Sequence, residues 1–195
     1  MWASVCSEHL TLFEPGAPTG RVLRPLASSA ISRVEDEPLH AAFLEHLPPE
    51  DVHLRFFHTM RSWTHHQLAR FTQIDYDREM AFVAVTQGEP AETLGAVRAI
   101  GNPDNTRAEF AIVVRTDLKG KGLGYRLMRK LIEYQKAKGT AELVGDVLAS
   151  NALMLKLART LGLLVKPDDQ TGVLGLSLIL SPTPESVNPT ASKIT

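Results

Sequence analysis

The sequence has little of several features that would each point to a particular class of protein. Its 195 residues contain one cysteine, Cys6, which excludes a disulfide within the chain and argues against a cysteine nucleophile or a cysteine-based zinc site. The 21 Lys and Arg residues nearly balance the 22 Asp and Glu residues, so the overall charge does not favour binding to nucleic acid or to an anionic membrane. The longest apolar stretch, residues 173–180, has strand length, and no secretion signal opens the chain. These absences predict a cytoplasmic protein with a local functional site.

The length and the distribution of proline and glycine predict one folded domain with a tail at each end. A chain of this size buries a single core of ordinary dimensions. Residues 1–20 contain two prolines and two glycines without a sustained hydrophobic period, and residues 181–195 are rich in Pro, Ser and Thr. We therefore expect a flexible segment over residues 1–20, a domain over 21–180 and a disordered tail over 181–195.

Hydrophobic periodicity predicts a mixed α/β domain. Strand-like patterns occupy residues 22–26, 80–86, 93–100, 108–114, 141–148 and 173–180. Helical patterns occupy residues 36–47, 50–57, 65–72, 123–138 and 151–161. Short turn-forming separators make the three strands between residues 80 and 114 antiparallel neighbours, and strands then alternate with helices. This order predicts a mixed sheet covered by helices.

The glycine-rich stretch KGKGLG, residues 119–124, joins a predicted strand to the longest predicted helix. Three glycines allow a turn with exposed backbone N–H groups, and the start of a helix adds partial positive charge, so the stretch can bind phosphate oxygens. Eight Lys and Arg residues against two acidic ones between residues 115 and 138 add a local basic patch. Glycines at this spacing are equally compatible with a purely structural turn.

Two common nucleotide-binding folds do not fit this loop. A dinucleotide-binding fold places its glycines after the first strand of repeated strand–helix units, whereas this loop follows antiparallel hairpins. A P-loop requires Lys followed by Ser or Thr after the last glycine, whereas Tyr125 and Arg126 follow Gly124. The loop therefore belongs to another kind of anion site or is structural.

The order of strand, glycine loop and helix resembles the acetyl-CoA binding motif of the GNAT N-acetyltransferases, whose loop has the form Gln/Arg-x-x-Gly-x-Gly/Ala. Four further stretches resemble the acetyltransferase domain of bacterial protein lysine acetyltransferases of the Pat type: LRFF at 54–57, QIDYDREM at 73–80, RAEF at 107–110 and LVGDVL at 143–148. The resemblance covers about residues 32–180. It implies the GNAT fold, with a mixed central sheet of about six to seven strands and helices on both faces.

The resemblance implies that acetyl-CoA lies in a gap between two parallel strands that splay apart, here residues 108–114 and 141–148. Strands that separate leave backbone groups unpaired, and a ligand with amide groups can satisfy them. Val113 and Val114 would pair with the pantetheine arm, Asn151 would contact it, and the pyrophosphate would meet the loop. The implied loop residues are Lys119, Gly120, Lys121, Gly122, Leu123 and Gly124.

Glu109 in the RAEF stretch is the candidate catalytic residue. A lysine amine has an ordinary pKa of about 10.4, so a carboxylate that accepts its proton would promote attack on a thioester. Pat-like domains use a glutamate at the matching position as general base, and a strand N–H near Val113 would stabilise the oxyanion. The alternative is a solvated carboxylate that pairs with Arg107.

Two departures from the family pattern concern the site. Lys119 stands where Gln or Arg is usual, and Ala158 stands where many members place a tyrosine that protonates the CoA thiolate. Tyr125 and Tyr134 are predicted to be helix residues away from the site. A thiol with an ordinary pKa of about 8.5 is already a fair leaving group, so chemistry without this tyrosine is expected to proceed.

The expected partners are acetyl-CoA and a protein with an accessible lysine, such as an acyl-CoA synthetase. A small-molecule amine as acceptor and a non-catalytic acyl-CoA sensor remain alternatives. Four histidines, at positions 53, 58, 65 and 66, share a polar region, but adjacent helix residues point to different faces and no Cys or spaced acidic pair accompanies them. No metal is expected.

Overall fold

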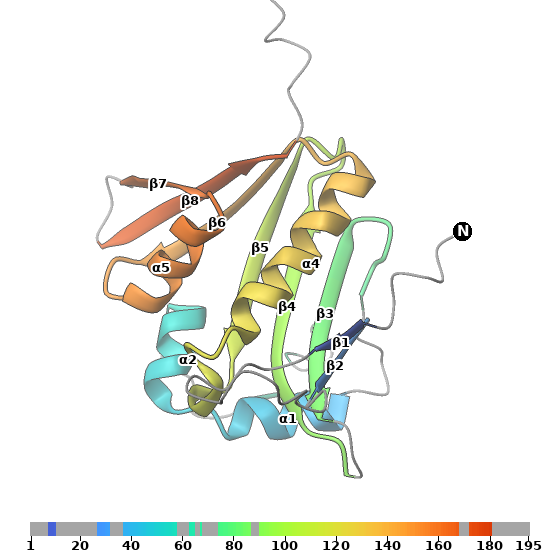
Figure 1. Ribbon diagram of the computed structural model, residues 1–195, viewed down its shortest axis with the longest axis vertical. Helices are drawn as coiled ribbons and strands as arrows, with labels where there is room; N and C mark the ends of the chain where they lie inside the picture. Colours follow the sequence, from blue (N-terminus) through green and yellow to red (C-terminus); the bar gives the residue numbers. More distant parts are fainter. Residues whose placement is uncertain are drawn as a thin grey trace, which may run out of the picture.

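The computed structural model describes residues 8–10, 27–31, 37–57, 63–64, 67, 74–86, 90–167 and 172–180. These residues form one sheet in the order β1-β2-β3-β4-β5-β6-β8-β7 (Figure 1). Its strands are β1 Glu8–Leu10, β2 Ala27–Ile31, β3 Glu79–Thr86, β4 Thr93–Gly101, β5 Arg107–Val114, β6 Glu142–Leu148, β7 Leu164–Pro167 and β8 Val173–Ile179. All neighbours are antiparallel except β5 and β6, which are parallel. The predicted mixed sheet is confirmed.

Helices cover both faces of this sheet. They are α1 Glu37–Glu45, α2 Pro49–Phe56, α4 Leu123–Lys138 and α5 Ala152–Thr160, with a short 3₁₀ helix, η2, at Thr116–Leu118. Along β5, Ile112 and Val114 pack against the core that contains α4 and α5, whereas Val113 packs against a separate cluster that includes Phe43 and Leu44 of α1. Because side chains alternate along a strand, α4 and α5 lie on one face and α1 on the other.

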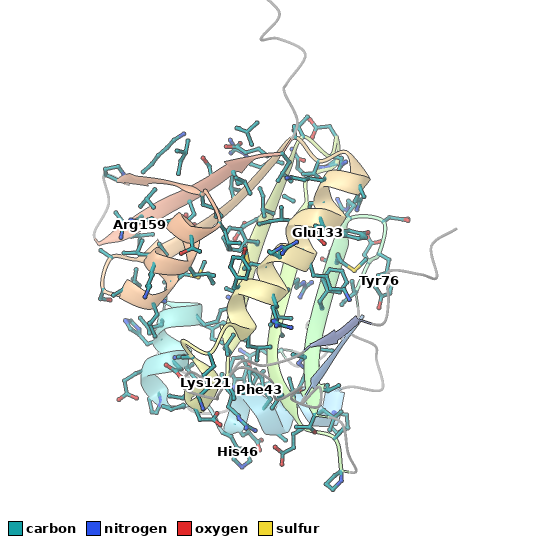
Figure 2. The ribbon with its side chains drawn as sticks, viewed as in Figure 1. Phe43, His46, Tyr76, Lys121, Glu133 and Arg159 are labelled. Atoms are coloured by element: carbon teal, nitrogen blue, oxygen red, sulfur yellow. The ribbon has the colours of Figure 1, made fainter. Side chains whose placement is uncertain are left out.

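The core of the domain lies under α4. Leu123, Leu127, Met128 and Leu131 recur every three to four residues and are each at most 1% exposed. Complete burial of such a side chain contributes about 1.5–3 kcal/mol. On the outer sides, Glu133 of α4 and Arg159 of α5 are exposed (Figure 2). No described helix combines the length and the apolar character needed to cross a membrane.

The predicted elements from residue 36 onward mostly coincide with observed ones. The sheet has three strands that were not predicted, β1, β2 and β7, which contain three, five and four residues. Elements this short carry no measurable period. The strand predicted at residues 22–26 lies outside the described residues, as do most of the helix predicted at 65–72 and the tail at 181–195.

The two parallel strands separate along their length (Figure 1). β5 and β6 pair only at Arg107–Glu142, Ala108–Leu143 and Glu109–Val144. Separation begins where the Phe110 ring packs over Gly145, since a Cβ on Gly145 would lie 2.8 Å from the ring and 3.0 Å from the Phe110 carbonyl oxygen. β4 continues beside β5, and β8 continues beside β6, so only the inner strand edges are left open. The predicted splayed pair is therefore present.

Candidate active site

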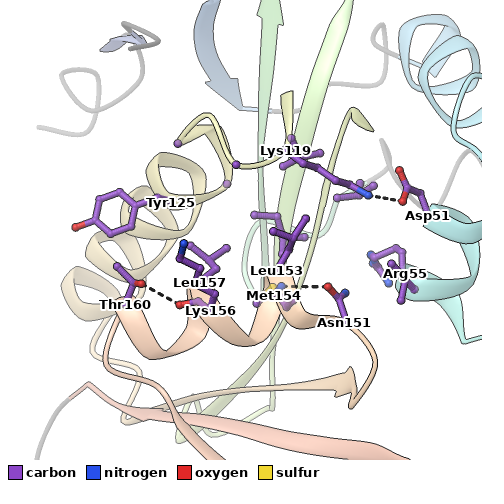
Figure 3. Close-up of a pocket in the computed structure, with 17 residues that line it drawn as sticks. Asp51, Arg55, Lys119, Tyr125, Asn151, Leu153, Met154, Lys156, Leu157 and Thr160 are labelled. Carbon is purple, nitrogen blue, oxygen red and sulfur yellow. Dashed lines mark hydrogen bonds and ion pairs between the residues drawn. The ribbon is translucent and has the colours of Figure 1, made fainter. Parts of the chain in front are cut away.

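A cavity of about 400 Å³ occupies the opening between β5 and α5 (Figure 3). We call it the large cavity. Its walls are formed by α2, β5, the glycine loop, α5 and the first residues of α4. The lining residues are Asp51, Leu54, Arg55, Ile112, Val113, Val114, Lys119, Gly120, Gly122, Gly124, Tyr125, Asn151, Leu153, Met154, Lys156, Leu157 and Thr160.

The glycine loop presents backbone donors to the large cavity. Gly120 and Gly122 have φ angles of 74° and 89°, a conformation that glycine adopts without strain. Gly122 is the N-cap of α4, and no described side chain caps this helix start. The first N–H groups of a helix have no partner within it, so they remain available to an anion together with the positive end of the helix dipole. This end of the large cavity suits a phosphate group.

Lysines supplement the backbone donors. Lys119 lines the large cavity and pairs with the Asp51 carboxylate of α2, which also accepts a hydrogen bond of 2.6 Å from the Thr116 hydroxyl. Lys156 of α5 lines the opposite wall. Lys121 is exposed (Figure 2) and is not among the residues that line the cavity, and the Leu123 side chain is fully buried in the core. Of the six predicted loop residues, four therefore line the large cavity.

Of Val113 and Val114, the two residues predicted to offer backbone groups at the open edge of β5, only Val114 directs them to the opening. The Arg115 N–H donates to Leu94 of β4 at 2.9 Å, and the Val113 carbonyl points toward Gly95 of β4. Backbone groups alternate in direction along a strand, so those of Ile112 and Val114 face the opening instead. The expectation is thus corrected for Val113, whose backbone is used within the sheet.

Asn151 lies at the start of α5 and lines the large cavity. Its side-chain oxygen accepts a hydrogen bond of 3.0 Å from the Met154 N–H and so caps the helix. This bond holds the side chain at the cavity wall. Its amide nitrogen makes no hydrogen bond within the described residues and can serve as a donor to a ligand.

A second hollow of about 80 Å³ adjoins the large cavity, and we call it the small pocket. Glu109 of β5 and Asp146 of β6 both line it. Five residues line both spaces and mark where they meet: Leu54, Arg55, Ile112, Asn151 and Met154. The predicted base therefore lies beside the region where the predicted cofactor would end.

Glu109 does not form the ion pair with Arg107 that was the alternative to a catalytic role. Arg107 pairs with Glu142 at 3.0 Å, and Glu109 makes no ion pair with any described residue. Glu109 does interact electrostatically with Arg55 of α2. Burial, followed by the charge of Arg98, lowers the pKa of Arg55 to about 10, while Glu109 acts in the opposite direction. Arg55 therefore stays positive at neutral pH.

Several cavity residues were not singled out from the sequence. Tyr125 is one of them: it lies on α4, as predicted, but it lines the large cavity and is 38% exposed. Asp51 and Arg55, one helical turn apart on α2, are two others, and the LRFF stretch at 54–57 was a hint of Arg55 alone. The Ala158 side chain is fully buried in the core, so residue 158 supplies no proton donor to the large cavity or to the small pocket.

Histidines and acidic residues do not form a metal centre within the described part of the chain. His53 is exposed on α2, and His58, His65 and His66 lie outside the described residues. The site instead combines an anion-binding helix start, an open strand edge and a carboxylate. This combination can hold an extended ligand that carries phosphate groups, with a proton acceptor near one end of it.

Comparison with known proteins identifies the class more closely. Residues 43–163 match the model of the acetyltransferase (GNAT) family. An acetyltransferase of Pseudomonas aeruginosa is 31% identical over 157 residues, which are 78% of this chain and 81% of that protein. The chain belongs to the GNAT acetyltransferase family, whose members take the acetyl group from acetyl-CoA.

Solved structures share the fold. The GNAT domain of S. lividans PAT superposes with a TM-score of 0.71 and 22% identity over 78% of this chain and 90% of that domain. The putative acetyltransferase yncA of Salmonella typhimurium, solved with acetyl-CoA, superposes with a TM-score of 0.65 and 17% identity, covering 80% of this chain and 95% of that one. At these identities the likeness concerns the fold alone.

Proposed function

We propose that this protein transfers an acetyl group from acetyl-CoA to the side-chain amine of lysine residues in proteins, with acyl-CoA synthetases as candidate acceptors. The observation that carries the proposal is the size of the small pocket. Pockets that bind small molecules have volumes of about 300–1,000 Å³. A space of about 80 Å³ accommodates an alkyl amine chain but not a whole metabolite, so the rest of the acceptor would stay outside.

The large cavity would hold the acetyl-CoA. Its pyrophosphate would lie at the start of α4, where Gly120, Gly122 and Lys119 line the wall. The pantetheine arm would follow the open edge of β5, where the backbone groups of Ile112 and Val114 face the opening. The thioester would then lie at the junction with the small pocket, beside Ile112 and Asn151.

In the proposed mechanism, Glu109 takes a proton from the lysine ammonium, directly or through water. The neutral nitrogen attacks the thioester carbonyl, and the backbone N–H of Ile112 stabilises the oxyanion. A carbon–nitrogen bond forms, the attacking nitrogen loses a second proton to solvent, the carbon–sulfur bond breaks, and CoA leaves as a thiolate. Since Ala158 provides no donor at the family's tyrosine position, solvent protonates the thiolate, which is a fair leaving group at an ordinary pKa of about 8.5.

The test combines the protein with acetyl-CoA and, separately, an acyl-CoA synthetase, a lysine peptide and a set of small amines. Acetylation is measured by mass spectrometry for the wild type, Glu109→Gln and the control Glu142→Gln, whose carboxylate pairs with Arg107 outside the pocket. We expect lysine acetylation that falls about 10²- to 10⁴-fold in Glu109→Gln. Binding of acetyl-CoA should be unchanged in both variants.

Other results would select the alternatives. Acetylation of small amines alone would favour a small-molecule acceptor. Acetyl-CoA binding without transfer to any acceptor would favour a sensor. Undiminished acetylation by Glu109→Gln would remove Glu109 from the mechanism.

A further inference from the structure

Asp146 lies across the opening from Glu109, and the proposed mechanism gives it no role. The register of the parallel strands places the two on one face: Glu109 pairs with Val144, and Asp146 is two residues further along β6. Side chains two apart on a strand point the same way. Leu143 and Val147 of the same strand are buried on the opposite face. Asp146 is therefore directed to the side of the sheet that carries Glu109.

The surroundings of Asp146 leave its carboxylate accessible. It lines the small pocket and is exposed. It makes no hydrogen bond or ion pair with any described residue. Gly175 stands opposite it on β8, so the neighbouring strand contributes no side chain that covers it. A carboxylate in this position is open to a ligand that enters the small pocket.

The charge of the small pocket favours a cationic ligand. Among its described lining residues, Glu109 and Asp146 are negative and Arg55 is positive, which gives a formal charge of minus one. An ammonium group would neutralise this charge, whereas a carboxylate or phosphate would increase the imbalance. Arg55 closes the α2 side, so the ammonium is directed to the two strands.

We propose that Asp146 is a positioning residue that binds the acceptor ammonium and delivers it to Glu109. The inference rests on the proposed function, because it concerns the acceptor side of the same reaction. Asp146 would hold the amine before Glu109 removes its proton, and it would select amines that are protonated at neutral pH. A negative charge beside the amine also favours its protonated form. Asp146 would therefore strengthen binding of the ammonium and make its deprotonation more difficult.

Because these two effects are opposite, Asp146→Asn should change KM and kcat in a way that a purely structural role of Asp146 would not produce. We expect the KM for a lysine peptide to rise about tenfold, since hydrogen bonds to charged groups are worth this much or more. The kcat at saturation should stay equal or increase, and the acidic limb of its pH profile should move to lower pH. The KM for acetyl-CoA and the melting temperature should not change.

Two further variants sharpen the test. Asp146→Glu keeps the charge and should restore most of the peptide affinity. Glu142→Gln removes a carboxylate from the same strand and the same face, outside the small pocket, and should behave like the wild type. A fall in kcat with unchanged KM in Asp146→Asn, or an equal rise in KM in Glu142→Gln, would overturn the inference.

Calorimetry of lysine-peptide binding to the CoA-loaded protein separates this inference from the proposed function. If the wild type transfers no acetyl group but binds the peptide tightly only with Asp146 intact, the proposed function fails and the ammonium site stands. If the wild type acetylates lysine and Asp146→Asn has unchanged kinetics and binding, only the role of Asp146 fails. Loss of acetylation and of Asp146-dependent binding together would reject both.

Discussion

The carboxylate of Asp51 on α2 binds the ammonium of Lys119 in the glycine loop. Asp51 is 8% exposed and also accepts the Thr116 hydroxyl at 2.6 Å, so both partners come from the segment that leads into the loop. One turn further along α2, Arg55 reaches the small pocket. The same helix therefore contacts the glycine loop through Asp51 and the small pocket through Arg55.

Replacing Asp51 by Asn should weaken both the fold and the loop. The change leaves Lys119 without its counter-charge at a half-buried position, and we expect a loss of about 1–3 kcal/mol in the free energy of unfolding. Urea denaturation measures this loss, and titration with acetyl-CoA should show weaker binding. The control is Asp117→Asn, whose exposed carboxylate pairs with Arg115 in the same segment and should cost little. Equal losses in the two variants would contradict the role given to Asp51.

Gly145→Ala should disturb the point where β5 and β6 separate. A Cβ at this position would lie 2.8 Å from the Phe110 ring and 3.0 Å from its carbonyl oxygen, so we expect overpacking that costs about 1–3 kcal/mol. Thermal unfolding and acetyl-CoA affinity are the measurements. Gly175→Ala on β8 adds the same methyl group where the nearest atom lies 3.9 Å away, and it should be tolerated. If Gly145→Ala matched it in stability, the packing of Phe110 would not set the separation.

Gly122→Ala should reduce acetyl-CoA affinity in addition to stability. The φ angle of 89° strains any residue with a Cβ by about 1–2 kcal/mol, although the added methyl group would meet no atom within 4 Å. Gly162→Ala provides the control, because Gly162 also has a positive φ and open surroundings but does not line the large cavity. Both variants should lose similar stability, and only Gly122→Ala should raise the Kd for acetyl-CoA. A similar rise in Kd for both would show that the loop has no special role.

Tyr125→Phe should leave kcat within about twofold of the wild type, because a residue away from the reacting atoms contributes little to transition-state stabilisation. Tyr125 lines the large cavity at the start of α4 (Figure 3) but is not among the residues that line the small pocket. Steady-state kinetics with lysine peptide and acetyl-CoA make the comparison. A large fall in kcat would instead make Tyr125 the proton donor for the thiolate.

Ala158→Tyr tests whether a proton donor for the thiolate can be supplied from position 158, where many members of the family have a tyrosine. The Ala158 side chain is fully buried, so a tyrosine there would have to displace core atoms, and we expect a loss of about 1–3 kcal/mol in stability. Circular dichroism during thermal unfolding measures it. An unchanged melting temperature together with a higher kcat would show that the helix can turn this position toward the cavity.

Sequence patterns predicted most of the fold because the patterns are long and regular. The four-residue spacing of Leu123, Leu127 and Leu131 identifies α4, and Gly139 with a φ of 80° ends it. β7 escaped prediction because its four residues, Leu164–Pro167, contain no clear alternation and depend on pairing with β8. Short edge strands are held by their neighbours and not by their own sequence.

The candidate site likewise has some features that follow from the local sequence and others that depend on the tertiary structure. The chain order of strand, glycine loop and helix is local, so the sequence by itself determined an anion-binding helix start and placed Glu109 on the strand before it. Only the tertiary structure decided that Asp51 would hold Lys119, that the backbone groups of Ile112 and not those of Val113 would face the opening, and that Asp146 would share a pocket with Glu109. These relationships depend on strand register and on the docking of α2, which join residues between about 20 and 70 positions apart in the chain and leave no periodic trace in it.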